Sequence, residues 1–197
     1  NDGESNSPTL LSTVIVINQN EIPVLKGVDT FITFNENDPP VVLNDLLVAN
    51  DADDTSFQSA TVTISSGYVA GEDILGVAER SGISVDWDIE SGSLSLRGES
   101  SKGNYESALR SLTYNNISDF PNTDPRNISW VVNDGIDNSS TLLSTVIMMS
   151  INDPPALEDA GDSLEFTEND GPTVIHQDLS VIDLDDTHLE SATITIS

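Results

Sequence analysis

The sequence predicts an all-β protein, in which β-sandwich units follow one another as tandem repeats and each unit carries one short helix. Three observations predict this class. Apolar and polar residues alternate with a period of two in several short segments, which is the pattern of half-buried strands. Clusters of Gly, Pro, Asn and Asp separate these segments, as turns do in sandwiches. The sequence also repeats itself at a fixed offset.

The internal repeat has an offset of 132 residues and needs no gap. Residues 1–65 and residues 133–197 are identical at 32 positions, whereas unrelated segments agree at roughly one position in seventeen. One shared run, Thr-Leu-Leu-Ser-Thr-Val-Ile, begins at Thr9 and again at Thr141. This degree of identity indicates a tandem duplication.

Equivalent prolines place the boundaries of the units. Pro23 and Pro155 occupy the same position in the repeat, and proline interrupts the hydrogen-bond ladder of a sheet. We therefore expect residues 1–22 to be the C-terminal strand or strands of a preceding repeat, residues 23–154 a complete repeat, and residues 155–197 the N-terminal part of the following one. This division predicts a segment of a longer array.

Seven or more short strands are expected in the complete repeat, among them residues 31–34, 59–65, 83–89, 128–132 and 142–151. The alternation in the second and third of these predicts one buried face for each. A turn at Glu90-Ser91-Gly92 leads into Leu94 and Leu96, which predicts a hairpin with Trp87 and Leu94 on the same apolar side.

The one helical pattern lies between the strands. Tyr105, Ala108, Leu109 and Leu112 follow the i, i+3, i+4, i+7 spacing of one helix face. Asn104 precedes them as a candidate N-cap, so a short helix is expected from Asn104 to Ser111.

The charge balance excludes several classes of partner. Six Lys and Arg against 34 Asp and Glu give 6 − 34 = −28, which rules out a basic groove for nucleic acid or for anionic membranes. Cysteine is absent and only two His occur, so a zinc or copper site is not expected. No apolar run approaches the roughly 18–20 residues that a membrane-spanning helix needs, so no membrane insertion is expected in this segment.

The acidic residues gather in four clusters at expected turns, over residues 36–38, 51–54, 133–135 and 152–155. In an extended backbone, Asp51 and Asp53 point the same way, and two carboxylates 4 Å apart repel each other by about 1 kcal/mol even in water. A cation removes this repulsion. Calcium binds six to eight oxygen ligands of the kinds that these clusters supply, whereas solvated acidic turns without an ion are the alternative.

Four motifs occur in the order of a cadherin repeat: Phe34-x-Glu36-Asn37, Ala49-Asn50-Asp51-Ala52-Asp53, Val132-Asn133-Asp134-Gly135 and Ile151-Asn152-Asp153-x-Pro155. The chain resembles the bacterial-type cadherin-like repeats of giant extracellular surface proteins, which are related to proteoglycan-type repeats. Segments similar to residues 105–114 and 126–135 are common in them. The resemblance extends over the entire chain.

The resemblance implies a cadherin-like, immunoglobulin-like sandwich with Ca²⁺ between adjacent repeats of the same chain. At the upstream junction it implies the ligands Asn20, Glu21, Asp51, Asp53 and Asp134. At the downstream junction it implies Glu36, Asn152, Asp153, Asp183 and Asp185, with Glu168 as the copy of Glu36. The chain departs from the family at Ser150 and at Arg97-Gly98-Glu99, each of which lacks an expected carboxylate, so fewer or weaker ions are implied.

Catalysis and sugar binding are not expected. Asp86 and Asp88 form a carboxylate pair, but they alternate outward from an expected strand without the signature of a pocket. Trp87 and Trp130 are in phase with the apolar positions of their strands, which favours core packing over a sugar-stacking platform. We assign no catalytic residue.

Three Asn-x-Ser sequons are candidate glycosylation sites if the source is eukaryotic. Asn127 begins an expected strand and is expected to be half-buried, so Asn116 and Asn138 are the better candidates.

Together these observations predict a non-catalytic, extracellular or cell-surface repeat segment that serves as a calcium-rigidified spacer or stalk in cell adhesion. The alternative is a structural subunit of an extracellular filament or appendage, in which other copies of the same protein are the partners.

Overall fold

A computed structural model describes residues 3–17, 19–27, 31–159 and 163–195. These residues form strands and one short helix, which confirms the mostly-β class. The elements are β1 (Val24–Lys26), β2 (Phe31–Asn35), β3 (Val41–Val42), β4 (Val48–Asn50), β5 (Ser56–Ser66), β6 (Asp73–Gly76), β7 (Ser84–Asp88), β8 (Ser93–Ser101), α1 (Lys102–Arg110), β9 (Thr113–Asn116), β10 (Arg126–Asn133), β11 (Leu142–Met149), β12 (Ala156–Glu158) and β13 (Ser180–Ile182).

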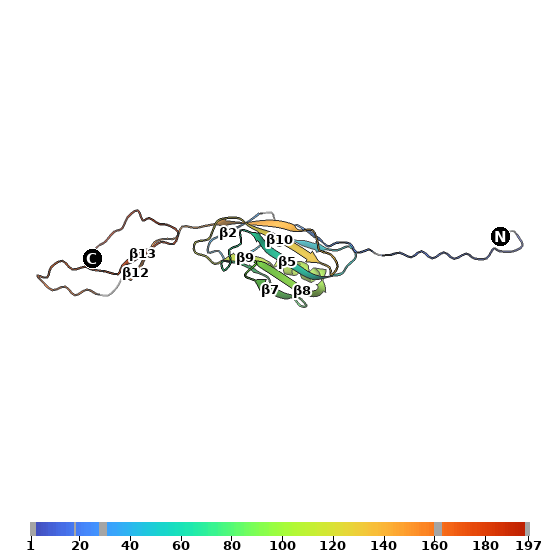
Figure 1. The fold of residues 1–197 in the computed structure, drawn as a ribbon, viewed down its shortest axis with the longest axis horizontal. Coiled ribbons are helices and arrows are strands. Elements are labelled where there is room, and N and C mark those ends of the chain that lie inside the picture. The colour runs from blue at the N-terminus through green and yellow to red at the C-terminus, as the bar shows by residue number, and fades with distance from the viewer. Residues whose placement is uncertain (1–2, 18, 28–30, 160–162, 196–197) are drawn as a thin grey trace.

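Most of the strands belong to a six-stranded sheet in the order β2-β11-β10-β5-β8-β7. Its pairs are antiparallel except for β11 and β2, which are parallel. A three-stranded sheet has the order β3-β9-β6, and β1 pairs with β4. Figure 1 shows these strands as the central body, with residues 3–22 extending from one end and residues 155–195 lying beyond the other. No helix in the described part of the chain is long and apolar enough to cross a membrane.

The expected alternation is confirmed in β5. Ala60, Val62 and Ile64 are buried, whereas Thr61 between them is exposed. Because β5 pairs with β10 on one side and β8 on the other, its apolar face lies at the centre of the six-stranded sheet. The strands expected over residues 31–34, 128–132 and 142–151 also form, as β2, β10 and β11.

The β7–β8 hairpin forms with the expected register, in which Trp87 is opposite Leu94. Gly92 has φ 64° and donates its N–H to the Asp88 carbonyl at 2.9 Å, so a residue that tolerates the left-handed region closes the turn. The prediction of one buried face over residues 83–89 is wrong, because Val85 is 38% exposed and Ile89 49% exposed. β7 lies at one edge of its sheet, and of the expected apolar face only Ile83 belongs to the core, with Trp87 partly packed against it.

The short helix begins two residues earlier than expected. Ser101, and not Asn104, is the N-cap, because the Ser101 hydroxyl accepts a hydrogen bond from the Asn104 N–H at 3.2 Å. The expected apolar face is confirmed: Tyr105, Ala108 and Leu109 are buried. This face packs α1 over β4, β5 and β8.

The two larger sheets contribute to a single hydrophobic core. Phe34 on β2 and Tyr114 on β9 meet edge to face with ring centroids 5.2 Å apart, so the six-stranded and three-stranded sheets are in contact. Trp130 is fully buried and donates its indole N–H to the Ser144 hydroxyl at 3.0 Å. The expectation of core packing is therefore confirmed for Trp130, whereas Trp87 is half-buried against Tyr68.

The sequence repeat has a counterpart in the strand pairing. β1 pairs with β4 so that Leu25 is opposite Ala49, and β12 pairs with β13 so that Leu157 is opposite Val181. Leu25 and Leu157 are 132 positions apart, and so are Ala49 and Val181. Residues 156–158 and 180–182 thus pair in the same register as residues 24–26 and 48–50.

The described part of residues 1–22 contains no strand. Leu10, Val14 and Ile15 are each at least 80% exposed. Their equivalents at the offset of 132 lie in β11, which is paired on both sides, with β10 and with β2. Residues 10–15 therefore have the same sequence as residues 142–147 of β11, without the neighbours that β11 has.

Candidate metal centres

Three carboxylates meet at the end of the central body where residues 19–22 join it. Asp51 follows β4, Asp134 follows β10, and Asp54 lies in the loop that leads into β5. Each of the three offers a carboxylate oxygen within 4.8 Å of the others. Two calcium–oxygen bonds of about 2.3–2.6 Å span about this separation, so the three oxygens can contact one ion. We refer to Asp51, Asp54 and Asp134 as the upstream cluster.

A local turn brings Asp54 into the upstream cluster. The Asp51 Oδ1 atom accepts hydrogen bonds from the N–H groups of Asp53 at 3.0 Å and Asp54 at 2.9 Å. These bonds bend the backbone at residues 51–54, so the expected extended conformation is wrong. As a result Asp54 meets Asp51, and Asp53 lies outside the group of three. Sequence reasoning missed Asp54 as a ligand, although it is identical to Asp186 in the repeat.

Asp51 provides an independent indication of a cation. The residue is 3% exposed, and its Oδ2 atom is buried without a hydrogen-bond partner among the described residues. A buried carboxylate oxygen that has lost water and gained no donor is unfavourable, because the charge is neither solvated nor paired. A bound metal ion at this position supplies the missing partner.

The other two carboxylates have pKa values shifted in opposite directions. Burial works to raise the pKa of Asp134, but hydrogen bonds from the Asp137 and Ile136 N–H groups and from Asn20 outweigh it and lower this pKa. The pKa of Asp54 is raised by desolvation and by the charges of Asp53, Asp51 and Asp134. Crowded negative charge at Asp54 is the condition that a divalent cation relieves.

Two residues of the leading segment contact the loops of the upstream cluster. The Asn20 Nδ2 atom donates to Asp134 Oδ2 at 3.0 Å and to Asp137 Oδ2 at 3.1 Å. The Glu21 N–H donates to Asp53 Oδ1 at 3.2 Å. The structure therefore brings the five residues expected at the upstream junction to the same end of the body. Asp137 is a further acidic neighbour that sequence reasoning missed.

A second group of carboxylates lies in the loop after β13. Asp183, Asp185 and Asp186 each offer an oxygen within 4.8 Å of the others, and we refer to them as the downstream cluster. The Asp186 N–H donates to Asp183 Oδ1 at 2.9 Å, and the Asp153 N–H donates to Asp185 Oδ2 at 3.1 Å. Buried oxygens without a partner among the described residues occur here as well, at Asp153 Oδ2 and Asp185 Oδ1.

The remaining expected ligands of the downstream junction differ in their placement. Glu36 is 3% exposed; its Oε2 atom accepts from the Ile151 N–H at 2.9 Å, and its Oε1 atom is buried without a partner among the described residues. Asn152 is exposed and donates to the Asp153 carbonyl at 2.8 Å. Glu168, the copy of Glu36, is exposed and lies outside both clusters.

The sequons have a different order of accessibility from the expected one. Asn116 is only 5% exposed, whereas Asn127 and Asn138 are exposed. The Asn116 Nδ2 atom donates to Asp73 at 2.7 Å, and its Oδ1 atom accepts from the Ser118 N–H at 3.0 Å. Because its side-chain amide is buried and hydrogen-bonded, Asn116 is a poorer candidate for glycosylation than Asn127 and Asn138.

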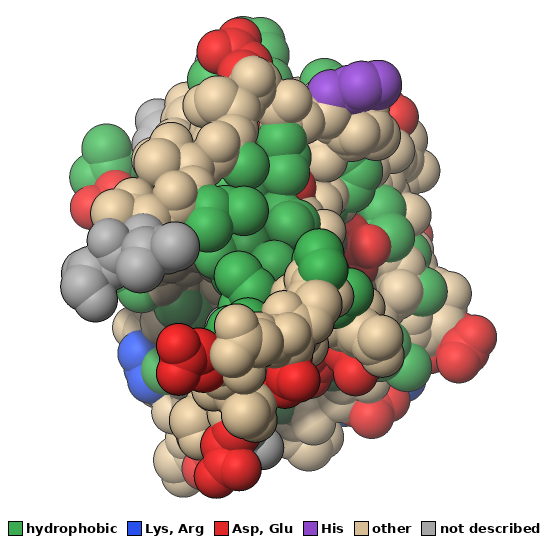
Figure 2. Space-filling view, turned by 90° about the vertical axis from the view of Figure 1, so that its left-hand side faces the viewer, with side chains coloured by type: hydrophobic (Ala, Val, Ile, Leu, Met, Phe, Trp, Pro, Cys, Tyr) green, Lys and Arg blue, Asp and Glu red, His purple; other side chains and the backbone are tan. Residues whose placement is uncertain are grey.

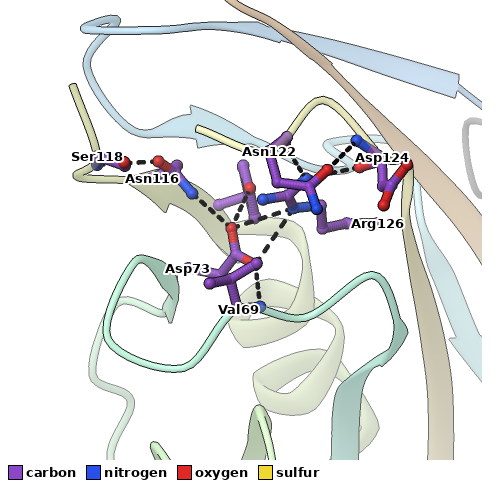
Figure 3. A network of polar contacts seen from close by, with 8 residues as sticks. Val69, Asp73, Asn116, Ser118, Asn122, Asp124 and Arg126 are labelled. Atoms are coloured by element: carbon purple, nitrogen blue, oxygen red, sulfur yellow. Dashed lines mark hydrogen bonds and ion pairs between the residues drawn. The ribbon is translucent and has the colours of Figure 1, made fainter. Parts of the chain in front are cut away.

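Asp73 and Arg126 form the centre of this buried network, which Figure 3 shows. Both side chains are fully buried, and their ion pair is 3.2 Å long. Tyr114 donates to Asp73 at 2.5 Å, and Arg126 donates to the carbonyls of Asn122 and Asp124. The network fixes the loop before β10 to β6 and β9, while the Arg126 Nη2 atom is buried without a hydrogen-bond partner among the described residues.

No protein-family model matches the chain, and no curated protein sequence matches it.

Proposed function

We propose that the chain is a non-catalytic, extracellular segment of cadherin-like, immunoglobulin-like β-sandwich repeats, in which Ca²⁺ at the junctions rigidifies a surface stalk used in cell adhesion. The observation that carries this proposal is the agreement between the two junctions. The hydrogen bond from Glu21 to Asp53 and the one from Asp153 to Asp185 join equivalent residues, at 3.2 and 3.1 Å.

The agreement extends into the acidic clusters. Asp54 donates its N–H to Asp51, and Asp186 donates its N–H to Asp183, both at 2.9 Å. In each junction the residues before the repeat boundary therefore contact the same acidic loop of the unit that follows it. A geometry that occurs twice at the offset of 132 is better explained by a conserved task of the repeat than by separately solvated turns.

The chemistry of the donors favours calcium over other metals. The upstream cluster offers carboxylates, and the neighbouring Asn20 and Glu21 add an amide and a further carboxylate. Hard oxygen donors of this kind suit Ca²⁺, whose larger shell also tolerates an irregular arrangement. Asp51, Asp54 and Asp134 would hold the ion from the body. Asn20 and Glu21 contact the same loops through the Asn20 Nδ2 atom and the Glu21 N–H, so their oxygens would have to turn toward the ion to bind it. A divalent charge there supplies attraction between segments that otherwise repel each other.

Exposed apolar side chains in the C-terminal segment, residues 155–159 and 163–195, also support a repeat architecture. Phe166 is 60% exposed and Leu179 45%, whereas their equivalents Phe34 and Leu47 are fully buried in the complete unit. Figure 2 looks onto this end of the molecule, where hydrophobic side chains form a patch bordered by Asp and Glu. These positions have core character, and they fit the first third of another unit of the same kind.

A specific observation also favours the filament as a second candidate. Residues 10–15 are identical to residues 142–147 of the interior strand β11, and the apolar side chains of residues 10–17 are exposed. An exposed strand of this kind can add to the sheet of another copy. Electron microscopy of native material distinguishes the two functions: single thin strands support a stalk, and ordered lateral contacts support a filament.

Calorimetric titration with calcium tests the proposed chemistry. The intact chain is expected to bind Ca²⁺, and to bind Mg²⁺ much more weakly because magnesium demands a smaller, regular octahedral shell. The double variant Asp51→Asn/Asp54→Asn is expected to lose the upstream component. The absence of calcium binding by the intact chain would overturn the proposal.

A further inference from the structure

A lysine lies beside the upstream cluster. Lys102 is the first residue of α1, and its Nζ atom donates to the Asp51 carbonyl oxygen at 2.6 Å. The backbone holds it there, because the Lys102 N–H donates to the Thr55 carbonyl at 3.2 Å and Ser101 caps the helix. Lys102 is half-buried, so its ammonium group is partly withdrawn from water.

The position of Lys102 is unfavourable for the helix itself. A positive charge in the first turn opposes the macrodipole, and the first turn of α1 contains no acidic residue to compensate it. A residue that violates a local preference needs a compensating interaction elsewhere in the structure. Here the interaction is the hydrogen bond from the Lys102 Nζ atom to the Asp51 carbonyl oxygen, in the loop that carries Asp51 and Asp54 of the upstream cluster.

The chain has only six basic residues, so one at this place is notable. Arg126 is paired with Asp73, and Arg110 is paired with Glu106 on the surface of α1.

We propose that Lys102 is a built-in counter-ion of the upstream cluster and that it sets the calcium affinity there. Its ammonium group offsets part of the carboxylate repulsion while no metal is bound, and it repels a divalent cation that approaches the same carboxylates. It also engages the Asp51 carbonyl oxygen, which is a potential calcium ligand. Lys102 thus helps to keep the loops of the upstream junction together without calcium. It also makes the site release the ion more readily than the same site would without this lysine. This inference rests on the proposed function.

A calcium titration of four chains tests the role of Lys102. Each carries Asp183→Asn, Asp185→Asn and Asp186→Asn, so the heat reports the upstream cluster alone. The first has no other change, and the second and third add Lys102→Met or Lys102→Gln. Both substitutions remove the charge, but Gln keeps a donor for the Asp51 carbonyl. The fourth adds Lys26→Met, which removes one exposed lysine on β1 as a control for net charge.

Calcium is expected to bind roughly tenfold more tightly to both Lys102 variants than to the first chain, because one like charge has been removed beside the ion. Their metal-free melting temperatures are expected to fall, and the Lys26 variant should change neither quantity appreciably. Equal affinities in the first chain and both Lys102 variants would overturn the inference and leave the calcium site standing. An equal gain in calcium affinity with Lys26→Met would also overturn it, since the net charge of the protein alone would then explain the change. No binding by any chain would overturn the calcium function itself.

Discussion

Asn20 and Asp134 are joined by a hydrogen bond of 3.0 Å between Nδ2 and Oδ2, although 114 positions separate them in the chain. This bond attaches the leading segment to the loop after β10 without any metal. The same nitrogen also donates to Asp137 at 3.1 Å. The junction is therefore partly assembled by the protein, and a bound cation would strengthen contacts that already exist.

The substitution Asn20→Ala removes both hydrogen bonds and leaves Asp134 and Asp137 without this donor. We expect faster hydrogen exchange of the Glu21 amide in the metal-free protein, because the leading segment detaches more often. The effect on unfolding of the central body is expected to be below about 1 kcal/mol, since the contact is peripheral. Exchange rates measured by mass spectrometry check this. An unchanged rate at Glu21 would mean that the contact does not restrain the segment.

Asp54→Asn is expected to weaken calcium binding more than Asp53→Asn does. Asp54 is a member of the upstream cluster, whereas Asp53 accepts the N–H of Glu21 with Oδ1, an atom that Asn retains. A loss of about tenfold for Asp54→Asn corresponds to about 1.4 kcal/mol, which is a reasonable contribution for one carboxylate ligand. Calorimetry of the two single variants provides a matched comparison. A larger loss with Asp53→Asn would place the ion away from Asp54.

Removing one partner of the buried ion pair is expected to destabilise the protein strongly. Asp73→Asn leaves the Arg126 charge uncompensated in the core, which typically costs about 3–5 kcal/mol of unfolding free energy. Arg110→Met is the control, because its pair with Glu106 is partly exposed and such pairs are worth less than about 1 kcal/mol. The substitution also removes the hydrogen bond from Arg110 Nε to the Leu47 carbonyl, which adds about 1 kcal/mol to the expected loss. Urea denaturation measures both variants. Similar losses in the two would show that the buried network contributes no special stability.

We expect the folded state to lose stability at alkaline pH, because Tyr105 and Tyr114 are buried. Burial raises the pKa of Tyr105 from its ordinary value of 10.0 to about 12, and burial and the hydrogen bond to Asp73 raise that of Tyr114. In the unfolded chain these groups lose their protons near pH 10, whereas the folded protein retains them. Stability from this source is thus complete below pH 10 and is lost as the pH rises toward 12.

Phenolate absorbance and circular dichroism, followed together, test this prediction. The phenolate signal is expected to appear above pH 10 and to coincide with unfolding. Tyr105→Phe is expected to reduce the dependence of unfolding on pH over this interval. Ionisation of Tyr105 and Tyr114 with the ordinary pKa of about 10 while the fold is intact would be incompatible with their burial.

The sequence predicted the strands best where burial alternates along a central strand. In β5, Ala60, Val62 and Ile64 are buried as expected, because the strand has neighbours on both sides. The same reasoning failed for Val85 in β7, because periodicity does not reveal that a strand lies at an edge. The helix face was predictable from its spacing, whereas the choice of Ser101 over Asn104 as N-cap depends on where β8 ends.

The acidic loops were predictable as a group but not in their local geometry. The repeat identified Asp51 and Asp183 as equivalent, and the structure places each in a group of three carboxylates. The assumption of an extended backbone selected Asp53, whereas hydrogen bonds to Asp51 Oδ1 turn the chain and select Asp54. The role of Lys102 was not predictable, because its contact with the Asp51 carbonyl oxygen joins residues 51 positions apart.

The melting temperature of the intact chain, measured in EDTA and then in excess calcium, tests the central claim most directly. At a free calcium concentration 100 times the dissociation constant, binding to the folded state adds about 2.7 kcal/mol of stability, so the melting temperature is expected to rise by several degrees. The rise should be absent when Asp51 and Asp54 are both Asn and the downstream aspartates are also replaced. Identical melting curves of the unsubstituted chain in EDTA and in calcium would contradict a calcium-stabilised junction.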